Sequence, residues 1–424
     1  MTVGDVQVAG SYRVPASPKG SRFGEEEVEQ VRSLLLSDVH LANKEVCAKF
    51  EAHLRDYLGA VDVVAVSSCT TALELVTRYL NLSADSQIVA SPLTFQATTA
   101  SLLDQGCQIR WCDIDDDTLS MSPRHLRDLL SPDVKAVYLT HYGGDIARID
   151  EICSLASEYG IRVIEDCAHA LGSTLRGRAA GTWGDFGCFS FHSLKNISTL
   201  GTGGAITTSS REVANELRGL RDVNALTVLR PTPNPFDGST LAQPLPVGEG
   251  HEGSAFTHEC MEVLRGGINA AMGDVAAAVG IVQLQRLPEL LSIRSSAAAR
   301  LDTALDELPG VQPLRAREGV QHSHHLYTFL AQSRETRDAI LWKLHEGGVE
   351  IVQRYFPLHL LPEYRFTGGR LGQCPTAEFT WFERLVNLPI NPWLTDDDVD
   401  YMASLIREAV VAVDRIPEPI TKIQ

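Results

Sequence analysis

Two residues in separate parts of the sequence carry the side chains with the clearest chemical potential. Lys195 lies in the run 188–196, Cys-Phe-Ser-Phe-His-Ser-Leu-Lys-Asn, and Asp166 closes the apolar run 162–165. A lysine placed soon after a strand can form a Schiff base with an aldehyde, and a carboxylate ending a buried strand can keep a pyridine nitrogen protonated. Pyridoxal phosphate (PLP) requires both groups. The pair therefore predicts a site for this cofactor.

Each of the two residues also has a purely structural interpretation. Asp166 could cap the turn that follows it, and Lys195 could lie in an exposed loop, where most lysines are found. Against the second alternative, polar side chains surround Lys195 and glycines follow at 201, 203 and 204. Glycines there would let the backbone approach a bound ligand closely.

A candidate phosphate site is supplied by residues 67–73, Ser-Ser-Cys-Thr-Thr-Ala-Leu. They follow a predicted strand and open a predicted helix, whose first turn offers free backbone N–H groups and a partial positive charge. An ordinary helix cap explains the same residues. The phosphate interpretation therefore depends on the other parts of the site.

Aromatic and histidine side chains complete the candidate site. Phe95 could stack on a pyridine ring or belong to the core, and His169 could meet the ring hydroxyl or be an ordinary hydrogen-bonded histidine. The run 322–325, His-Ser-His-His, superficially suggests a metal site. No matching carboxylate or cysteine pattern accompanies it, so no metal site is predicted.

An alternation of strands and helices must position these residues. The predicted strands are 61–67, 87–90, 108–114, 136–141, 161–165 and 186–191, and the predicted helices between them are 71–80, 95–103, 123–130 and 150–159. Such alternation is typical of an α/β fold with a mostly parallel sheet and helices on both faces. Ligands of these sheets bind at the carboxyl ends of the strands, where Asp166 and the segment 190–195 lie.

The rest of the chain predicts an insert and a second unit. Residues 222–259 are rich in proline and glycine, so we expect an irregular lid or surface loop without a regular element. Two helices are expected over 269–287 and 290–308, separated at Pro288. We predict a large domain over 1–287 that includes the insert, and a linking helix with a smaller α+β domain over 288–424.

Composition excludes several classes of function. The 424 residues can bury a sizeable core, and the net charge of −17 argues against binding to nucleic acid or to a membrane surface. The nine cysteines include no Cys-x-x-Cys pair, so no zinc ribbon or disulfide framework is predicted. The N-terminal residues lack a secretion-signal pattern, and no apolar run reaches the roughly 20 residues of a membrane span. A cytoplasmic location is expected.

Taken together, the motifs resemble one family, the DegT/DnrJ/EryC1/StrS sugar and cyclitol aminotransferases, a branch of the PLP-dependent aspartate aminotransferase (type I) fold. The resemblance runs from about residue 20 to about residue 410 and rests on the order and spacing of motifs that are weak singly. The motifs lie at 50–51, 57–59, 68–73, 92–95, 112–115, 164–172, 187–196, 203–204, 280–284, 355–359 and 388–389.

The resemblance implies a role for each candidate residue. Lys195 would carry the cofactor as its internal aldimine, Asp166 would pair with the pyridine nitrogen, Phe95 would stack on the ring, and His169 would lie near the ring hydroxyl. The phosphate would be held by Cys69, Thr70 and Ser190. Asn269 would reach the site from a second subunit, and His192 would lie on the substrate side.

The resemblance also implies a reaction and partners. An amino group would pass from L-glutamate or L-glutamine to a keto sugar, nucleotide-linked by preference, or to a keto cyclitol, in amino sugar or secondary metabolite biosynthesis. The freed amine of Lys195 would move a proton between the donor α-carbon and the cofactor. Because the active site of this family lies at a dimer interface, a homodimer is implied.

The chain departs from the family pattern at several positions. Thr202 replaces a glutamate after the lysine, Cys69 replaces a glycine, and Ala270 and Ala271 replace a tyrosine and an arginine. The insert is also longer than usual. These changes put the substrate, and even the reaction type, in question more than the binding of PLP.

Two alternatives to transamination follow. A PLP enzyme could instead catalyse an elimination or oxidation on a sugar, although relatives that act as dehydratases have histidine at the position of Lys195. A non-catalytic regulator with this fold would be expected to have lost the Lys195–Asp166 pair, which is intact, and to carry a basic DNA-binding module, which is not evident.

Overall fold

The computed structural model describes residues 12–16, 20–41, 44–146, 148–222, 227–229, 261–263 and 266–414. Most of the predicted insert, 222–259, lies outside these residues. Within it, the short strand β10 (Thr227–Leu229) pairs with β11 (Met261–Val263), so the expectation that no regular element occurs there was wrong. The β-branched residues of β10 favour an extended backbone despite the prolines that follow. No helix within the described ranges has both the length and the apolar character needed to cross a membrane.

A seven-stranded sheet forms the centre of the fold, in the order β1-β9-β8-β5-β4-β2-β3. Neighbouring strands from β8 to β3 are parallel, whereas β9 is antiparallel to both β1 and β8. The strands are β1 (Asp62–Val66), β2 (Gln87–Ala90), β3 (Gln108–Trp111), β4 (Val134–Thr140), β5 (Arg162–Asp166), β8 (Phe186–Ser190) and β9 (Gly204–Thr208). The predicted mostly parallel sheet is confirmed with all six predicted strands, and β9 was not foreseen.

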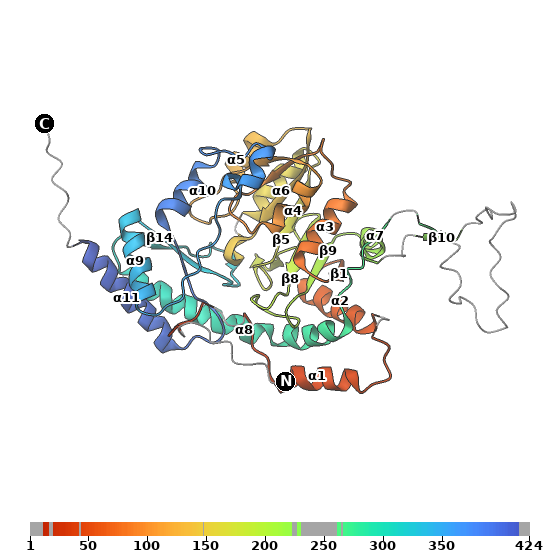
Figure 1. Ribbon diagram of the computed structural model, residues 1–424, viewed down its shortest axis with the longest axis horizontal. Helices are drawn as coiled ribbons and strands as arrows, with labels where there is room; N and C mark the ends of the chain where they lie inside the picture. Colours follow the sequence, from red (N-terminus) through yellow and green to blue (C-terminus); the bar gives the residue numbers. More distant parts are fainter. Residues whose placement is uncertain are drawn as a thin grey trace.

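Helices cover both faces of this sheet, as predicted (Figure 1). Each face buries its own apolar cluster, and the side chains of the strands alternate between the two clusters. One face is covered by α2 (Glu45–Leu58), α5 (Pro123–Leu129), α6 (Ile149–Glu158) and the start of α8 (Asp274–Asp306), the other by α3 (Cys69–Tyr79), α4 (Ala97–Asp104) and α7 (Arg211–Arg221). The N-terminal helix α1 (Glu25–Leu35) packs on α8.

The single helix α8 replaces the two helices predicted over 269–287 and 290–308. Pro288 lies inside it, although a proline in a helix removes a hydrogen bond and costs about 3 kcal/mol or more. Burial outweighs this cost, because Leu287 and Leu290, on either side of the proline, are fully buried. The prediction failed because proline chemistry was weighed without the packing of the surrounding leucines.

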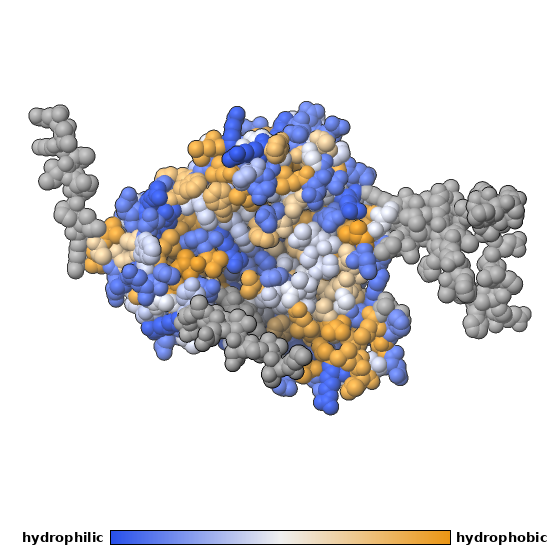
Figure 2. Space-filling model, in the orientation of Figure 1, coloured by the Kyte–Doolittle hydropathy of each residue, from blue (hydrophilic) through white to orange (hydrophobic). Residues whose placement is uncertain are grey.

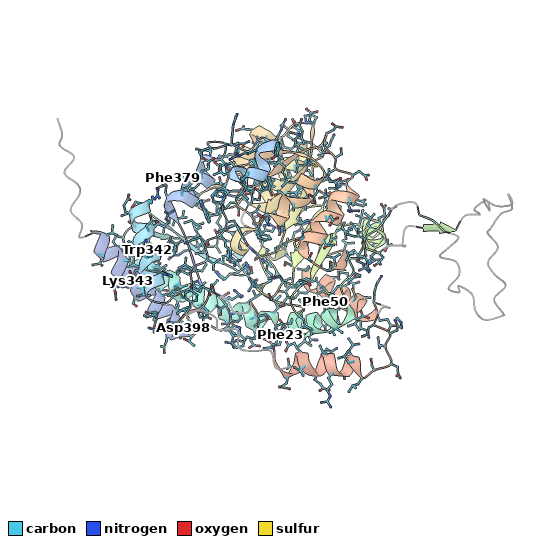
Figure 3. The ribbon with its side chains drawn as sticks, in the orientation of Figure 1. Phe23, Phe50, Trp342, Lys343, Phe379 and Asp398 are labelled. Atoms are coloured by element: carbon cyan, nitrogen blue, oxygen red, sulfur yellow. The ribbon has the colours of Figure 1, made fainter. Side chains whose placement is uncertain are left out.

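Close packing of α8 on α2 also explains a glycine. Phe50 of α2 lies against α8 (Figure 3), and a Cβ atom added at Gly280 would be 2.8 Å from the Phe50 ring. The ring of Phe50 also packs edge to face with that of Phe191, with ring centroids 5.4 Å apart. Only glycine at position 280 lets the two helices approach this closely.

A second, smaller unit consists of an antiparallel sheet and two helices. Its strands, in the order β12-β14-β15, are β12 (Val311–Pro313), β14 (Tyr327–Ala331) and β15 (Leu385–Leu388), and its helices are α9 (Arg334–Glu346) and α11 (Asp396–Asp414). Lys343 of α9 pairs with Glu408 of α11 at 2.8 Å. The end of α8 belongs to the apolar cluster of this unit, so the boundary predicted after residue 287 falls inside a continuous helix. The division into two domains stays a prediction.

The remaining elements are short. They are β6 (Thr174–Leu175), β7 (Arg178–Ala179), β13 (Val320–Gln321), α10 (Pro375–Phe379), and the single helical turns Tyr142–Gly144, Leu358–Leu360, Pro362–Thr367 and Thr380–Arg384. Strands β13, β6 and β7 form a small antiparallel sheet that ties the second unit to the loop after β5.

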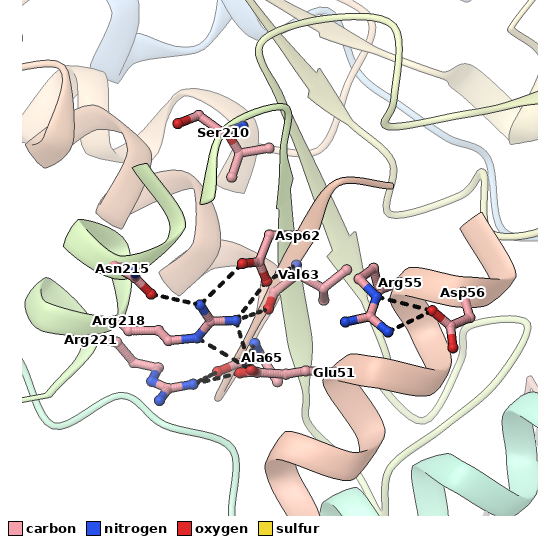
Figure 4. Close-up of polar contacts among 11 residues, drawn as sticks. Glu51, Arg55, Asp56, Asp62, Val63, Ala65, Ser210, Asn215, Arg218 and Arg221 are labelled. Atoms are coloured by element: carbon pink, nitrogen blue, oxygen red, sulfur yellow. Dashed lines mark hydrogen bonds and ion pairs between the residues drawn. The ribbon is translucent and has the colours of Figure 1, made fainter. Parts of the chain in front are cut away.

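A charge cluster, defined here as Glu51, Asp62, Arg218 and Arg221, fixes one edge of the large sheet (Figure 4). Glu51 of α2 pairs with Arg218 and Arg221 of α7 at 3.1 and 2.8 Å, and Arg218 pairs with Asp62 at 2.7 Å. Arg221 also donates to the carbonyl of Ala65 in β1 at 3.0 Å. Every charge in the cluster therefore has an opposite partner, and the cluster joins α2, β1 and α7.

Candidate active site

The end of β5 directs two neighbouring carboxylates to opposite faces of the sheet. Glu165 accepts N–H groups from Gly181, Trp183 and Gly184 at 2.7–2.8 Å and contacts His141 Nε2 at 2.8 Å. Because successive side chains of a strand alternate, Asp166 points to the other face. Glu165 is fully engaged in holding the loop 181–184 and has no capacity left for a ligand.

Asp166 is buried and only partly satisfied. Its Oδ2 accepts the hydroxyl of Thr98 at 2.6 Å, and its Oδ1 accepts the N–H of Ala168 at 3.0 Å. A carboxylate has about four acceptor positions, so capacity remains for a further donor. An N–H group facing Asp166 from the cavity would complete its coordination.

The N-terminus of α3 lies at the same edge of the sheet. Ser68 caps the helix by accepting the N–H of Thr71 at 3.1 Å, while the N–H groups of Cys69 and Thr70, in the first turn, have no acceptor within the helix. The thiol of Cys69 points inward, 3.4 Å from the carbonyl of Cys188 and 3.8 Å from Asp166. Cys69 can therefore offer an anion only its backbone N–H.

Lys195 lies in a tight loop after β8. Its N–H donates to the carbonyl of His192 at 2.8 Å, and the N-terminal segment crosses this loop so closely that a Cβ atom at Gly20 would be 2.1 Å from Leu194. Burial, with a smaller contribution from the charge of Arg354, lowers the pKa of Lys195 to about 8, while Asp166 opposes the shift. The amine therefore loses its proton at a lower pH than an ordinary lysine amine does.

A cavity of about 490 Å³ brings these groups together. Asp166 and Lys195 both line it, together with the start of α3 at 68–70. The other predicted residues that the structure places on its wall are Phe95, His169, Ser190 and His192. The cavity opens at the carboxyl ends of β5 and β8, where the sheet topology predicts a ligand site.

His169 is held in one protonation state. Its Nδ1 accepts the N–H of Gly143 at 3.3 Å, and its Nε2 is 2.9 Å from the hydroxyl of Tyr355. Burial lowers the pKa of His169 well below its ordinary value, with Lys195 and Arg354 adding to the shift. The ring is neutral with its proton on Nε2, which leaves the hydroxyl hydrogen of Tyr355 free to donate elsewhere.

Phe95 and His192 lie at the more open part of the site. Phe95 is 53% exposed toward the cavity, and its ring centroid is 5.9 Å from that of Tyr355. His192 is exposed, and its Nδ1 accepts the N–H of Leu194 at 3.3 Å. Partial burial, followed by the charges of Lys195 and Arg354, lowers the pKa of His192.

Asn269 is the one predicted site residue that does not line this cavity. It is exposed on an extended segment beside the end of β1, where the N–H of Ser67 donates to the carbonyl of Ala270 at 2.8 Å. Its neighbours, Ala270 and Ala271, form part of the same segment. Contact of Asn269 with the cavity of a second subunit stays a prediction.

Four residues of the site were not assigned a role from the sequence. Thr98 holds Asp166, and Tyr355 and Arg354 line the cavity. The ring of His325 lies against that of His169, with centroids 4.1 Å apart and the planes tilted by 33°. The runs 322–325 and 355–359 stand out in the sequence as motifs, and these motifs were the available signal that His325 and Tyr355 could belong to the site. Their positions could not be placed because a different unit of the chain brings them to the sheet.

The histidine run 322–325 does not converge on a common centre. His322 stacks on His324 at 4.4 Å, whereas His325 turns toward His169. Within the described part of the chain, the group with metal-like spacing is His141, Glu165 and Cys167. The oxygens of Glu165 are already taken by N–H donors, so this group is best explained as a structural hydrogen-bond centre.

Comparisons with known proteins find one family over most of the chain. The model of the DegT/DnrJ/EryC1/StrS aminotransferase family matches residues 21–407. The chain is 30% identical to the spore coat polysaccharide biosynthesis protein SpsC of Bacillus subtilis, over 92% of this chain and 96% of that protein. It is 29% identical to the dTDP-4-dehydro-2,3,6-trideoxy-D-glucose 4-aminotransferase of Saccharopolyspora spinosa, over 92% and 95%.

Solved structures share the fold over nearly their whole length. The aminotransferase TlmJ of Streptoalloteichus hindustanus is 29% identical with a TM-score of 0.79, covering 93% of this chain and 99% of that one. The PLP form of Spr1654 from Streptococcus pneumoniae is 24% identical with a TM-score of 0.77, covering 93% and 98%. The expected type I fold is thereby confirmed.

Proposed function

The chain belongs to the DegT/DnrJ/EryC1/StrS aminotransferase family, and on this premise we propose that it transfers an amino group from L-glutamate or L-glutamine to a keto sugar or keto cyclitol. It is a PLP-dependent enzyme. A nucleotide-linked acceptor is favoured because the relative from S. spinosa is named for a dTDP-linked sugar. The setting we propose is amino sugar or secondary metabolite biosynthesis in the cytoplasm.

The residues present fit the cofactor. Asp166 has spare acceptor capacity for a pyridinium N–H, and Phe95 offers an exposed ring on the wall of the same cavity. The free N–H groups at the start of α3, with the hydroxyls of Thr70 and Ser190, form an anion-binding end of the cavity. Lys195 lines the same cavity with a lowered pKa, as covalent attachment requires.

When bound, PLP supplies an electron sink for charge that develops on the donor α-carbon. The protein's own contribution is to hold and move protons. Asp166 would accept the N–H of the ring nitrogen, and the amine of Lys195, in its neutral form, would take up and release the proton of the donor α-carbon. His169, fixed as the Nε2–H form, orients Tyr355 at the wall of the cavity.

The observation that carries the proposal is the shared cavity of Lys195 and Asp166. Both groups line one cavity, and burial, with a smaller contribution from a nearby cation, lowers the pKa of the amine to about 8. An exposed loop lysine would keep the ordinary lysine pKa of roughly 10.4. The structural alternatives for these two residues therefore lose support.

The proposal includes a homodimer with a shared active site. Figure 2 shows hydrophobic side chains gathered over α1, where Val28, Leu35 and Leu36 are 58–76% exposed. Exposed apolar side chains in such number mark an interaction surface. A second copy covering this surface would accord with the role proposed for Asn269, which is exposed and does not line the cavity of its own chain.

Elimination or oxidation on a sugar remains the alternative reaction. Thr202 lines the cavity where family members carry a glutamate, so this position lacks a carboxylate that could donate or accept a proton. The retained Lys195 and its lowered pKa favour transamination, because this reaction depends on a free amine that can shuttle protons.

The visible absorption spectrum tests the function. Purified protein supplied with PLP should show the band of a lysine-bound cofactor, and addition of L-glutamate or L-glutamine should convert it to the pyridoxamine form. A panel of nucleotide-linked keto sugars and keto cyclitols should then restore the first band. A band that no amino donor converts would favour elimination or oxidation, and no band at all would favour a non-catalytic role.

A further inference from the structure

A smaller cavity of about 160 Å³ adjoins the one that holds Lys195, and we call it the side pocket. Leu194, Val352 and Arg354 line both cavities, so the two share a wall. The volume is several times the roughly 30 Å³ that one water occupies in the liquid, which leaves room for a small organic group. The side pocket therefore lies within reach of a ligand bound beside Lys195.

His325 lines the side pocket and carries an unpaired hydrogen-bond acceptor. The residue is 5% exposed, and its Nε2 has no partner among the described residues. Its Nδ1 is 3.3 Å from Oδ1 of Asn196, whose Nδ2 donates to the carbonyls of Leu171 and Ser323. Nδ1 must therefore donate. Burial also lowers the pKa of His325 well below its ordinary value, so the neutral ring leaves Nε2 as an acceptor.

Glu350 adds a second acceptor to the same wall. The residue is half-buried, and one of its carboxylate oxygens accepts the N–H of Ala16 at 2.9 Å. A carboxylate has further acceptor positions and no hydrogen to donate. The side pocket, lined by Glu350 and His325, therefore favours a ligand that donates hydrogen bonds and carries no negative charge.

Arg354, on the shared wall, favours a negatively charged ligand group instead. It forms no ion pair with any described carboxylate, and its guanidinium lies 6.0 Å from the ring centroid of Tyr355. Its charge is felt by Lys195, His169 and His192, whose pKa values it lowers. An uncompensated guanidinium in a cavity wall is a site for a carboxylate.

We propose that the side pocket selects L-glutamine over L-glutamate as the amino donor, by binding its side-chain carboxamide between Glu350 and His325 while Arg354 holds its α-carboxylate. The inference rests on the proposed function and names its donor. A carboxamide nitrogen carries two N–H groups, which match the two acceptors. The side-chain carboxylate of L-glutamate would leave both acceptors unpaired and place a negative charge beside Glu350.

Donor selectivity in the first half-reaction tests this proposal. The rate of conversion to the pyridoxamine form is measured as a function of L-glutamine and L-glutamate concentration, and the two second-order rate constants are divided. We expect the wild-type ratio to favour L-glutamine by roughly tenfold or more. Glu350→Gln, which keeps an acceptor for Ala16 but removes the charge, should lower the ratio by about tenfold, mainly by improving L-glutamate.

Two further variants separate selectivity from folding. Glu346→Gln, on the exposed end of α9, makes the same chemical change outside both cavities and should leave the ratio unchanged. His325→Asn retains an N–H for Asn196 but removes the Nε2 acceptor, so it should weaken L-glutamine without improving L-glutamate. Calorimetric titration of the PLP-loaded protein with glutaramate and glutarate, which cannot react, should show the same preference for the carboxamide.

The outcomes are distinguishable. Conversion by both donors with a ratio near one, or a ratio that Glu350→Gln leaves unchanged, overturns the side-pocket proposal and leaves the aminotransferase intact. A change confined to the second half-reaction assigns the side pocket to acceptor hydroxyls and overturns the proposal equally. Failure of both donors to convert the cofactor overturns the proposed function and this inference with it.

Discussion

The charge cluster at the edge of the sheet and the cavity around Lys195 both bury charged side chains, but they treat them differently. In the charge cluster, Glu51 has two arginine partners and Arg218 has two carboxylate partners, all within 3.1 Å. In the cavity, Arg354 has no carboxylate partner among the described residues, and the pKa of Lys195 is lowered rather than raised.

The difference indicates where a ligand is expected. Removing charges from water is unfavourable unless partners replace the solvent, so a protein that only needs stability pairs them internally. A cavity in which a cation and a partly satisfied carboxylate remain uncompensated has its missing partners supplied from outside. Asp166 and Arg354 are such groups. Glu165, one residue before Asp166, is not, because the protein itself supplies its hydrogen-bond partners.

Replacing Lys195 should have the largest effect. Lys195→Ala removes the amine that carries the cofactor and moves the proton, so turnover should fall by more than roughly 10³-fold. The visible band of the lysine-bound cofactor should disappear, while the far-ultraviolet circular dichroism stays unchanged. Retention of the band in this variant would assign the attachment to another lysine.

Replacing Asp166 should rank second. Asp166→Ala removes the acceptor for the ring N–H, so turnover should fall by about 10²-fold or more and the dissociation constant for PLP should rise. Equilibrium dialysis with PLP and steady-state kinetics measure the two effects. Full activity with normal PLP affinity would show that the ring nitrogen lies elsewhere.

Much of this arrangement could be predicted from the sequence, and the remainder has physical reasons. Short apolar runs and helical spacing identify β5, β8 and α3, which carry Asp166, the lysine loop and the helix N-terminus. The single helix α8 was missed because burial of Leu287 and Leu290 overrides Pro288. Arg354 and His325 could not be placed, because their positions depend on how the second unit docks against the sheet, which local patterns do not encode.

Arginine replacements sharpen the comparison between the two regions. Arg221→Met breaks a buried pair and leaves Glu51 partly uncompensated, so the free energy of unfolding should fall by about 3–5 kcal/mol. Arg354→Met removes an unpaired cation and should change it by less than about 1 kcal/mol while weakening amino donor binding. Urea unfolding and donor titrations measure both. Equal losses of stability would erase the distinction between the regions.

The pH dependence of Lys195 gives the smallest predicted effect. Because its pKa is lowered from 10.5 to about 8, the reactive neutral amine becomes half-populated near pH 8 instead of near pH 10.5. Labelling of the cofactor-free protein with an amine-reactive reagent, read by peptide mass spectrometry, should rise through pH 8 at Lys195. Exposed Lys343, which pairs with Glu408, serves as the control and should react only at higher pH.

A crystal structure of the protein grown with PLP tests the central claim most directly. We predict a covalent bond from Lys195 Nζ to the cofactor and a hydrogen bond of about 2.7–2.9 Å between the Asp166 carboxylate and the pyridine nitrogen. The phosphate should lie at the start of α3. A cofactor bound away from Asp166, or attached through a different lysine, would contradict the assignment.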